Sequence, residues 1–389
     1  MDKLKIAKMP EQYSIVRETW LRFRSQTLSF YALVGIIIIF LVAVYAPLLA
    51  GSAPLIIIEG NFNFHFPFVY YVFNPDGPEL LLDKIYNYLI FFIPLLLIFR
   101  MLRFRKRYFL ILALLLAVPF LWKWHISYRW DEASRPDNNS SFVLSSPVRY
   151  TPYELSGEPY EPPSMKHFLG TDGIGRDILS RIIFGARISI AVGFFATLIS
   201  LIIGTAMGLT SGYFGGWIDI FIMRFIEIFI CFPAFLLLLI LVASMMDLKF
   251  EQSGLILIPV IGILSWTSFA RIVRGETLKQ RELPYIQSCK VFGMSNRRIM
   301  FVHILPNILG PVIVTIIFAI ASNILAESAL SFLGFGVQSP TASWGELLKQ
   351  AFSDPLRYWN LTLWPGMMIF LSIFLLNLVG EGARKSIGD

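Results

Sequence analysis

The chain has 389 residues, of which 56% are hydrophobic and only 15% are charged, and its mean hydropathy is +0.65. Soluble domains carry about 45–50% apolar and about 25% charged residues, so this composition excludes a soluble enzyme, a disordered protein and a fibre. The net charge of +7 is typical, in a membrane protein, of basic loops kept in the cytoplasm. We therefore expect an all-α, polytopic bundle of membrane helices that contacts lipid and does not bind nucleic acid.

Long apolar runs predict at least six membrane spans. A helix needs about 20 mainly apolar residues to cross the hydrocarbon layer. Six runs reach or approach this length: Tyr31–Ala50, Ser189–Ser211, Ile220–Met246, Gly254–Ala270, Asn307–Ala326 and Asn360–Gly380. A cleaved signal peptide is the alternative for the first run, because Ala50-Gly-Ser-Ala53 resembles a cleavage site. An uncleaved anchor is favoured, because the stretch before the run is too long for a signal peptide.

Two shorter runs, Ile85–Phe99 and Tyr108–Trp122, flank a basic stretch at 100–107. As helices they would each extend about 22 Å, less than the roughly 30 Å hydrocarbon core. Basic side chains that reach the interface can lengthen both spans, so we predict a membrane hairpin with a cytoplasmic tip. The alternative is an interfacial amphipathic hairpin that does not span.

Basic residues predict the orientation. Lys and Arg cluster in the N-terminal tail, in the loop 271–303 and near the C-terminus, and the positive-inside rule places all three in the cytoplasm. Six or eight spans satisfy this arrangement and seven do not. The chain then divides into a cytoplasmic tail (1–30), the first span and inserted hairpin (31–122), an extracytoplasmic loop (123–187) and a core membrane domain (188–389).

The sequence lacks motifs for chemistry of its own. It has no Gly-x-x-x-x-Gly-Lys-Ser/Thr phosphate loop, no His-Glu-x-x-His and no serine nucleophile elbow. The four histidines are not at metal-binding spacing. We expect no catalytic residue, metal or cofactor in this chain, so that energy for any driven transport enters from a partner.

The cytoplasmic loop 271–306 predicts two short helices joined by a glycine turn. Pro284 suits the first turn of a helix over Tyr285–Phe292. Gly293 allows the left-handed residue that ends this helix, and a second helix follows over Asn296–Ile304. A DNA-binding helix-turn-helix and a plain surface hairpin are alternatives. A docking site for a soluble partner is favoured, because an exposed apolar bend is costly unless covered. Two apolar side chains lie at this bend: Phe292 and Met294.

The same loop resembles the EAA loop of ABC importer permeases. The stretches Tyr285–Gly293 and Ile304-Leu-Pro306 keep the family's glycine and its hydrophobic-Leu-Pro step, whereas Gln-Ser-Cys stands in place of Glu-Ala-Ala. In the family, this loop forms a coupling helix that sits in a cleft of the ATPase. The coupling residues that the resemblance implies are Tyr285, Gln287, Ser288, Cys289, Phe292, Gly293, Met294, Leu305 and Pro306. Gln287 can donate a hydrogen bond there but cannot make the ionic contact of the family's Glu.

Further stretches resemble the C-type permease of dipeptide, oligopeptide and nickel importers. They are His167–Arg181, Tyr213–Asp219 with Phe232-Pro233, and Leu325–Val337 with Ser343-Trp-Gly345. Within the first stretch, the family's signature loop comprises Gly170, Thr171, Asp172, Gly175, Arg176 and Asp177. The resemblance covers residues 160–389 and implies a six-span permease core, from which the hairpin 85–122 departs.

Ionisable residues within the apolar runs are candidates for the translocation path. There are four of them: Asp219, Arg224, Glu227 and Glu327. Such groups usually face the bundle interior or a pathway. Arg224 and Glu227 are i,i+3 neighbours that can form a structural pair, with path lining as the second interpretation. Asp219 and Glu327 suit interfacial positions near helix ends.

The resemblance implies a permease subunit of a binding-protein-dependent ABC importer for di- and oligopeptides, in the cytoplasmic (inner) membrane with both termini cytoplasmic. Its implied partners are a homologous permease, two ATP-binding subunits that alone bind ATP, and an extracytoplasmic substrate-binding protein. A nickel or peptide-like antibiotic importer fits the same motifs. Two other classes are an ATPase-independent channel or secondary transporter, which predicts carboxylates at unwound helices in both halves, and a membrane-bound enzyme or sensor.

Overall fold

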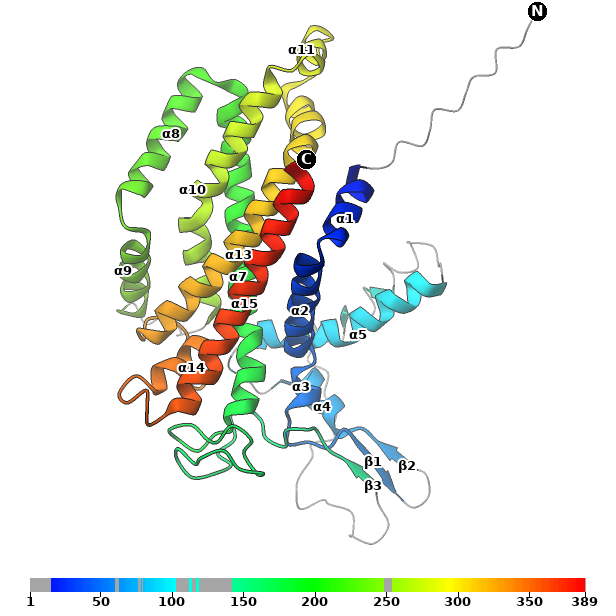
Figure 1. Ribbon diagram of the computed structural model, residues 1–389, viewed down its shortest axis with the longest axis vertical. Coiled ribbons are helices and arrows are strands. Elements are labelled where there is room, and N and C mark those ends of the chain that lie inside the picture. Colours follow the sequence, from blue (N-terminus) through cyan, green and yellow to red (C-terminus); the bar gives the residue numbers. More distant parts are fainter. Residues whose placement is uncertain are drawn as a thin grey trace, which may run out of the picture.

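The computed structural model describes residues 15–59, 63–75, 78, 80–102, 112–113, 117–118, 142–247 and 254–388. In this part of the chain, six helices are long and apolar enough to cross a membrane, and a bent helix pair would make a seventh span. Figure 1 shows the long helices as a bundle, with α11 at one end and a small sheet and short helices at the other. The polytopic all-α fold is therefore confirmed.

The described elements are mainly helices, with three short strands among them. In chain order they are α1 (Ile15–Ser25), α2 (Thr27–Val44), α3 (Ala46–Leu49), β1 (Ile56–Glu59), β2 (Asn63–His65), α4 (Pro67–Phe73), α5 (Leu80–Leu102), β3 (Phe142–Leu144), α7 (Ile178–Phe214), α8 (Gly216–Cys231), α9 (Ala234–Asp247), α10 (Gly254–Arg281), α11 (Pro284–Val291), α12 (Asn296–Arg298), a π-helical segment (Ile299–Ile304), a 3-10 turn (Leu305–Ile308), α13 (Leu309–Phe332), α14 (Trp344–Gln350) and α15 (Trp359–Gly388).

The centre of the bundle is the contact between α7 and α10, the closest helix pair. Small residues on α7 let the two backbones approach. A Cβ on Gly208 would lie 2.6 Å from the carbonyl oxygen of Ala270, and a Cβ on Gly212 would lie 2.7 Å from the Cβ of Thr277. Glycine at these positions therefore sets the distance between the two spans.

One expected span is not straight. The run Ile220–Met246 forms α8 and α9, which meet at an angle of 80°. Phe232 between them has extended backbone angles, because Pro233 disfavours a helical conformation of the residue before it and lacks an N–H group to continue the helix. In Figure 1 this bent pair stands at one side of the bundle.

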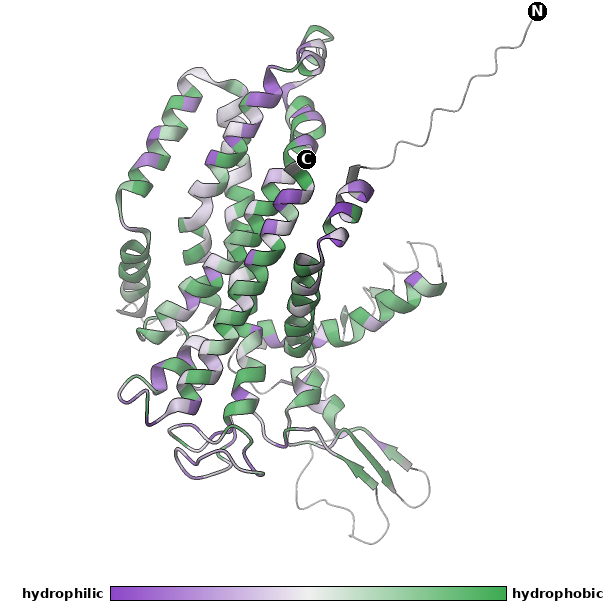
Figure 2. Ribbon diagram, in the orientation of Figure 1, coloured by the Kyte–Doolittle hydropathy of each residue, from purple (hydrophilic) through white to green (hydrophobic). Residues whose placement is uncertain are grey.

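The sheet combines two strands from residues 56–65 with one from 142–144 and has the order β2-β1-β3. Both pairs are antiparallel, with Ile57 opposite His65 on one side and Val143 on the other. The sheet and α3 and α4 lie at the end of the bundle away from α11 (Figure 1). Figure 2 shows mainly hydrophobic residues along the middle of the long helices, with hydrophilic ones concentrated near α11 and α14.

The hairpin prediction is only partly covered by the structure. Its first arm, Ile85–Phe99, lies in α5, which is long enough to span. The tip from 103 and most of the second arm lie outside the described residues. The two arms do contact, because the Tyr88 hydroxyl donates to the Ala113 carbonyl at 3.2 Å. Figure 1 shows α5 running across the bundle rather than along it, which is the geometry of the interfacial alternative.

Candidate coupling and translocation site

The loop 271–306 folds as predicted into a helix, a glycine turn and a second helical segment. α11 begins at Pro284, and Gly293 has φ +71°. The Met294 N–H donates to the Cys289 carbonyl at 3.1 Å, which is the six-to-one hydrogen bond of a helix that ends at a left-handed glycine. Ser295 precedes α12, but its side chain makes no cap hydrogen bond. The two helical segments are therefore held at a fixed bend.

The apolar surface at this bend differs from the expected one. Val291 is 86% exposed and Phe292 is 80% exposed. Met294 is only partly exposed and packs with Ile286 and Ile299 in a small core beneath α11. The prediction of two apolar side chains exposed at the bend is thus correct for Phe292 and wrong for Met294. The second exposed apolar side chain is Val291.

The other predicted coupling residues divide between surface and core. Gln287 is exposed and donates to the Arg281 carbonyl at 3.1 Å, and Ser288 donates to the Pro284 carbonyl at 3.0 Å. Cys289 is buried in the small core, Leu305 is half-buried against it and Pro306 is exposed. The Tyr285 hydroxyl donates to Gln280 Oε1 at 2.7 Å and accepts from Asn307 at 3.1 Å. Tyr285 therefore joins the two sides of the loop.

The structure adds a connection that the sequence did not indicate, between this loop and the turn from α7 to α8. The Tyr213 hydroxyl donates to Asn296 Oδ1 at 2.9 Å, and Lys290 Nζ lies 5.5 Å from the centre of the Tyr213 ring. Arg281 donates to the carbonyl oxygens of Gly212 and Tyr213 at 3.2 and 3.3 Å. A displacement of α11 would consequently act on the start of α8.

Asp219, at this same start of α8, is held by Arg274 of α10. The Arg274 guanidinium donates to both carboxylate oxygens, at 2.5 and 2.7 Å, and the Ser211 hydroxyl donates to one of them. The two-point geometry of an arginine and a carboxylate fixes direction as well as distance. Asp219 therefore lies near a helix end, as expected, and is partly buried in an ion pair with another helix.

Arg224 and Glu227 form the predicted pair, at 2.6 Å, but they are not buried within this chain. Their side chains are 75% and 51% exposed. Trp217 and Phe221 are exposed on the same helix. The exposed surface of α8 therefore combines a charged pair, which is costly against lipid, with large apolar side chains.

Glu327 is fully buried in α13, contrary to the interfacial position expected for it. Its carboxylate accepts hydrogen bonds from Ser189 at 2.9 Å, Ser331 at 2.9 Å and Ser328 at 3.3 Å. These hydroxyls compensate the loss of hydration. Glu327 therefore joins α7 to α13 inside the bundle and does not line an open path in this conformation.

The signature loop at 170–177 lies directly before α7 and forms a buried charged clasp. Gly170 and Gly175 have φ +83° and +88°. A Cβ on Gly175 would lie 2.1 Å from the Gly157 carbonyl oxygen, so glycine is required there. Asp177 caps α7, because its carboxylate accepts from the Ser180 N–H at 2.8 Å. The loop is the turn before a helix that the sequence predicts.

Four charged side chains close the clasp, two of each sign. Arg176 donates to Asp172 at 2.7 Å, and Arg181 Nε lies 3.3 Å from the same carboxylate. Arg181 also donates to Glu346 of α14 at 2.6 Å. Burial lowers the pKa of the Arg176 guanidinium and Arg181 lowers it further, whereas Asp172 opposes the shift. Thr171 is buried beside this group. The clasp binds the loop to α7 and α14, so the role of these charges in the structure is to hold the loop in place.

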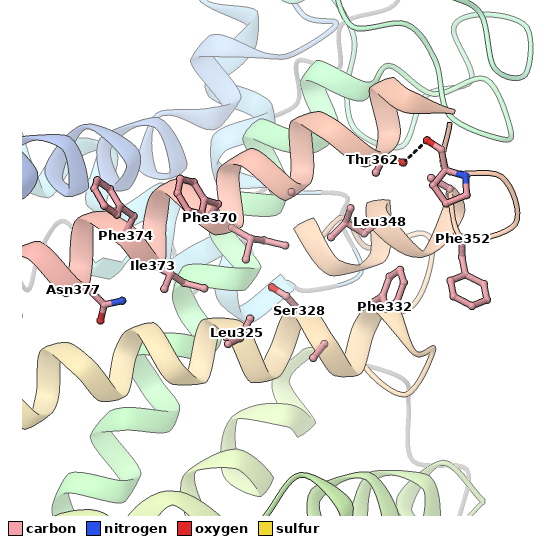
Figure 3. Close-up of a pocket in the computed structure, with 15 residues that line it drawn as sticks. Leu325, Ser328, Phe332, Leu348, Phe352, Thr362, Phe370, Ile373, Phe374 and Asn377 are labelled. Atoms are coloured by element: carbon pink, nitrogen blue, oxygen red, sulfur yellow. Dashed lines mark hydrogen bonds between the residues drawn. The ribbon is translucent and has the colours of Figure 1, made fainter. Parts of the chain in front are cut away.

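An apolar groove of about 700 Å³ lies between α13, α14 and α15. Figure 3 shows side chains of α15 and α13 facing each other across it, with the hydrogen bond from Thr362 to the Pro355 carbonyl (3.0 Å) at one end. The labelled lining residues are Leu325, Ser328, Phe332, Leu348, Phe352, Thr362, Phe370, Ile373, Phe374 and Asn377. No predicted site residue lines this groove. Among the residues that the structure describes, no group of three or more His, Cys, Asp or Glu side chains is placed to hold a metal ion.

Gly293 should be required for coupling but not for folding. A Gly293→Ala substitution meets no atom within 4 Å but forces alanine into φ +71°, at a cost of about 1–2 kcal/mol. We expect normal membrane insertion and reduced ATP-driven uptake, measured in proteoliposomes with the partner subunits. Gly275→Ala is the matched control, because Gly275 also has open space but ordinary helical angles. Equal uptake by the two variants would show that the left-handed turn has no role in coupling.

Comparison with known proteins identifies the architecture. Residues 201–387 match the model for the binding-protein-dependent transport system inner membrane component, and residues 14–66 match the N-terminal transmembrane domain of oligopeptide transport permease C. The glutathione transport system permease protein GsiD of Pectobacterium atrosepticum is 40% identical over 58% of this chain and 74% of its own length.

Two further relatives agree. The dipeptide transport system permease protein DppC of Alkalihalophilus pseudofirmus is 41% identical over 58% of this chain and 72% of its own. The oligopeptide transport system permease protein OppC of Haemophilus influenzae is 40% identical over 57% and 70%. With six apolar helices and a loop of the EAA type, the chain belongs to the inner membrane permeases of binding-protein-dependent ABC importers, in the peptide and oligopeptide branch.

Proposed function

We propose that this permease moves short peptides across the inner membrane, together with a homologous permease, two ATPase subunits and an extracytoplasmic binding protein. The three relatives are named for glutathione, dipeptides and oligopeptides, which share a small peptide-like skeleton. The α11 end of the bundle and both termini are cytoplasmic in this proposal, because the basic loops lie there. ATP is bound by the partners, so this subunit supplies the path and the contact that drives it.

The exposed tip of α11 is the observation that carries the coupling proposal. Val291 and Phe292 are strongly exposed, yet the small core below them is complete. Val291 and Phe292 are not members of this core, so packing within the chain does not explain why two apolar side chains stand at this tip. Exposed apolar side chains grouped at one point are typical of a protein contact, and this point lies at the end of the bundle with the basic loops (Figure 1).

The path is assigned to the open face of α8. Arg224 and Glu227 require water or a polar surface beside them. A water-filled path between two permeases satisfies this requirement and lipid does not. Each permease then provides half of the path, and the contacts of Tyr213 and Arg281 link α8 to the coupling loop. ATP-driven movement of α11 would change the access of the path.

The decisive experiment is substitution of Phe292. Burying a Phe is worth about 1.5–3 kcal/mol, so Phe292→Ala should weaken ATPase binding about 10- to 100-fold. Phe292→Asp should be worse, because it would bury an unpaired charge. The measurements are ATPase copurification and substrate-stimulated hydrolysis.

Leu356→Asp is the control for this experiment. Leu356 is 90% exposed and lies between α14 and α15. Because α14 lies at the end of the bundle away from α11 (Figure 1), the charge introduced there should leave ATPase copurification unchanged. Full retention of the ATPase by Phe292→Asp would place the docking site elsewhere on the chain. ATP hydrolysis by the isolated subunit would contradict the permease assignment itself.

A further inference from the structure

A second cavity, of about 350 Å³, lies between residues 47–87, the loop 151–154 and α7. Its walls come from the residues after α3, from α4, from the first turns of α5, from the loop 151–154 and from α7. It lies at the end of the bundle away from α11 (Figure 1). The walls from 67 onward fall between the two matched regions, 14–66 and 201–387. The cavity is therefore built largely by sequence that neither family model covers.

The floor of the cavity is a buried ion pair. Arg187 of α7 donates to Asp83 Oδ1 at 2.9 Å and to Asn87 Oδ1 at 2.8 Å. It also donates to the carbonyl oxygens of Ala43 at 2.8 Å and Val44 at 3.1 Å. The guanidinium is thus committed to four acceptors within the protein. It anchors α5 to α7, and its positive charge is already engaged by Asp83.

Among the described residues that line the cavity, the carboxylates of Asp83 and of the exposed Glu154 outnumber the guanidinium of Arg187 by one. Asp83 binds Arg187 through Oδ1 alone. Glu154, at the rim, accepts only a long hydrogen bond of 3.4 Å from the Thr151 N–H. Two carboxylates and one guanidinium line the space, so a ligand with a single positive charge would balance it. An anion would meet two carboxylates and an arginine with four of its five N–H donors in use.

Aromatic rings form the remaining walls. The cavity is lined by Phe68, Tyr71, Tyr153 and Phe184. The Phe184 ring already faces a cation, because the central carbon of the Arg187 guanidinium lies 5.3 Å from its centre, and the apolar area of the rings favours a carbon skeleton on the ligand. We propose that this cavity binds the protonated amino group of an amphiphilic organic cation, with the amino group at Glu154 and Asp83 and the apolar part against the rings.

Two sources present this chemistry at the outer end of the bundle. One is a free amine such as the amino terminus of a peptide. The other is the headgroup of an aminophospholipid, since α3 follows directly on the membrane span α2. The test uses the full chain, purified with its copurifying subunits, in nanodiscs of phosphatidylglycerol, which contains no amine. The probe is 2-phenylethylammonium, measured by calorimetry, and 2-phenylethanol is the uncharged comparison.

The cation should bind saturably at one site and the alcohol should not compete. Glu154→Gln should raise the Kd for the cation roughly tenfold, because one charge-assisted contact is lost. Glu158→Gln, four residues along in an exposed position outside the cavity, should leave the Kd unchanged. Equal binding of the alcohol, or an unchanged Kd in Glu154→Gln, would overturn the site.

A repeat with phosphatidylethanolamine in the nanodiscs separates the sources. Competition by this lipid with the probe would assign the site to the lipid headgroup, and undisturbed probe binding would assign it to a free amine. Neither measurement uses ATP or transport, so the cation site and the proposed import of peptides succeed or fail independently.

Discussion

A Gly208→Leu substitution is expected to prevent stable assembly of the membrane core. The new Cβ alone would lie 2.6 Å from the Ala270 carbonyl oxygen and 2.7 Å from the Val273 Cβ. The first of these atoms belongs to the backbone of α10, so no change of side-chain rotamer relieves the contact. Overpacking in a well-filled core costs about 1–3 kcal/mol and occasionally more, and here it would also separate two spans.

The measurement is the yield of monodisperse protein after detergent extraction, with thermal unfolding of whatever is recovered. Gly275→Leu is the control, because that glycine lies in α10 itself with no atom within 4 Å of its added Cβ. It should give ordinary yield and an unfolding temperature close to that of the unmodified chain. A Gly208→Leu protein with the same behaviour would show that α7 and α10 do not pack in this way.

The membrane spans were predictable because their signal is local. Apolar runs of sufficient length specify helices in lipid whatever their neighbours are, and the six expected runs all coincide with helices. The break at Pro233 is local as well, since proline disrupts a helix by its own geometry. Length alone could not reveal it, because the residues on both sides remain apolar and the run reads as one span.

The orientation of α5 could not be read from the sequence. An apolar helix of this length fits a span or an interfacial position equally well by composition. In the structure α5 is held by a contact between residues 100 positions apart in the sequence, Arg187 and Asn87. Arg187 lies just before the apolar run Ser189–Ser211, and nothing local indicates which residues it binds.

The coupling turn was predictable and its neighbours were not. Pro284 and Gly293 act through their own backbone preferences, so the bend follows from the chain itself. The burial of Met294 depends instead on Ile299, which lies beyond the turn on the second helical segment. Tyr213 likewise meets Asn296 only because α7 and the loop are brought together by the bundle.

For the four ionisable residues in the apolar runs, contacts within one helix were predictable from the sequence and contacts between helices were not. Arg224 and Glu227 pair at i,i+3, as spacing predicts. Asp219 and Glu327 were expected at interfaces, but each finds partners on another helix: Arg274 for the first and Ser189 for the second. A carboxylate near a helix end therefore gives no information on its burial until the packing of the bundle is known.

Removal of Glu346 should strongly destabilise the end of the bundle away from α11. Its carboxylate accepts from the buried Arg181 at 2.6 Å. Glu346→Ala would leave the clasp with two arginines and one carboxylate. Breaking a buried ion pair by deleting one partner costs about 3–5 kcal/mol, because the remaining charge is uncompensated. The loop 170–177 should detach from α14, and limited proteolysis in that loop should accelerate at a lower unfolding temperature.

Glu227→Ala provides the comparison, because it removes the carboxylate of an ion pair of the same length, 2.6 Å, in an exposed position. Pairs of that kind contribute about 0–1 kcal/mol, so the unfolding temperature should hardly change. The double substitution Arg181→Met with Glu346→Leu should recover most of the loss, since an apolar replacement of both partners leaves no buried charge of theirs. Arg176 and Asp172 would remain as a balanced pair. If Glu346→Ala and Glu227→Ala lowered the unfolding temperature equally, the clasp would not be what fixes this loop.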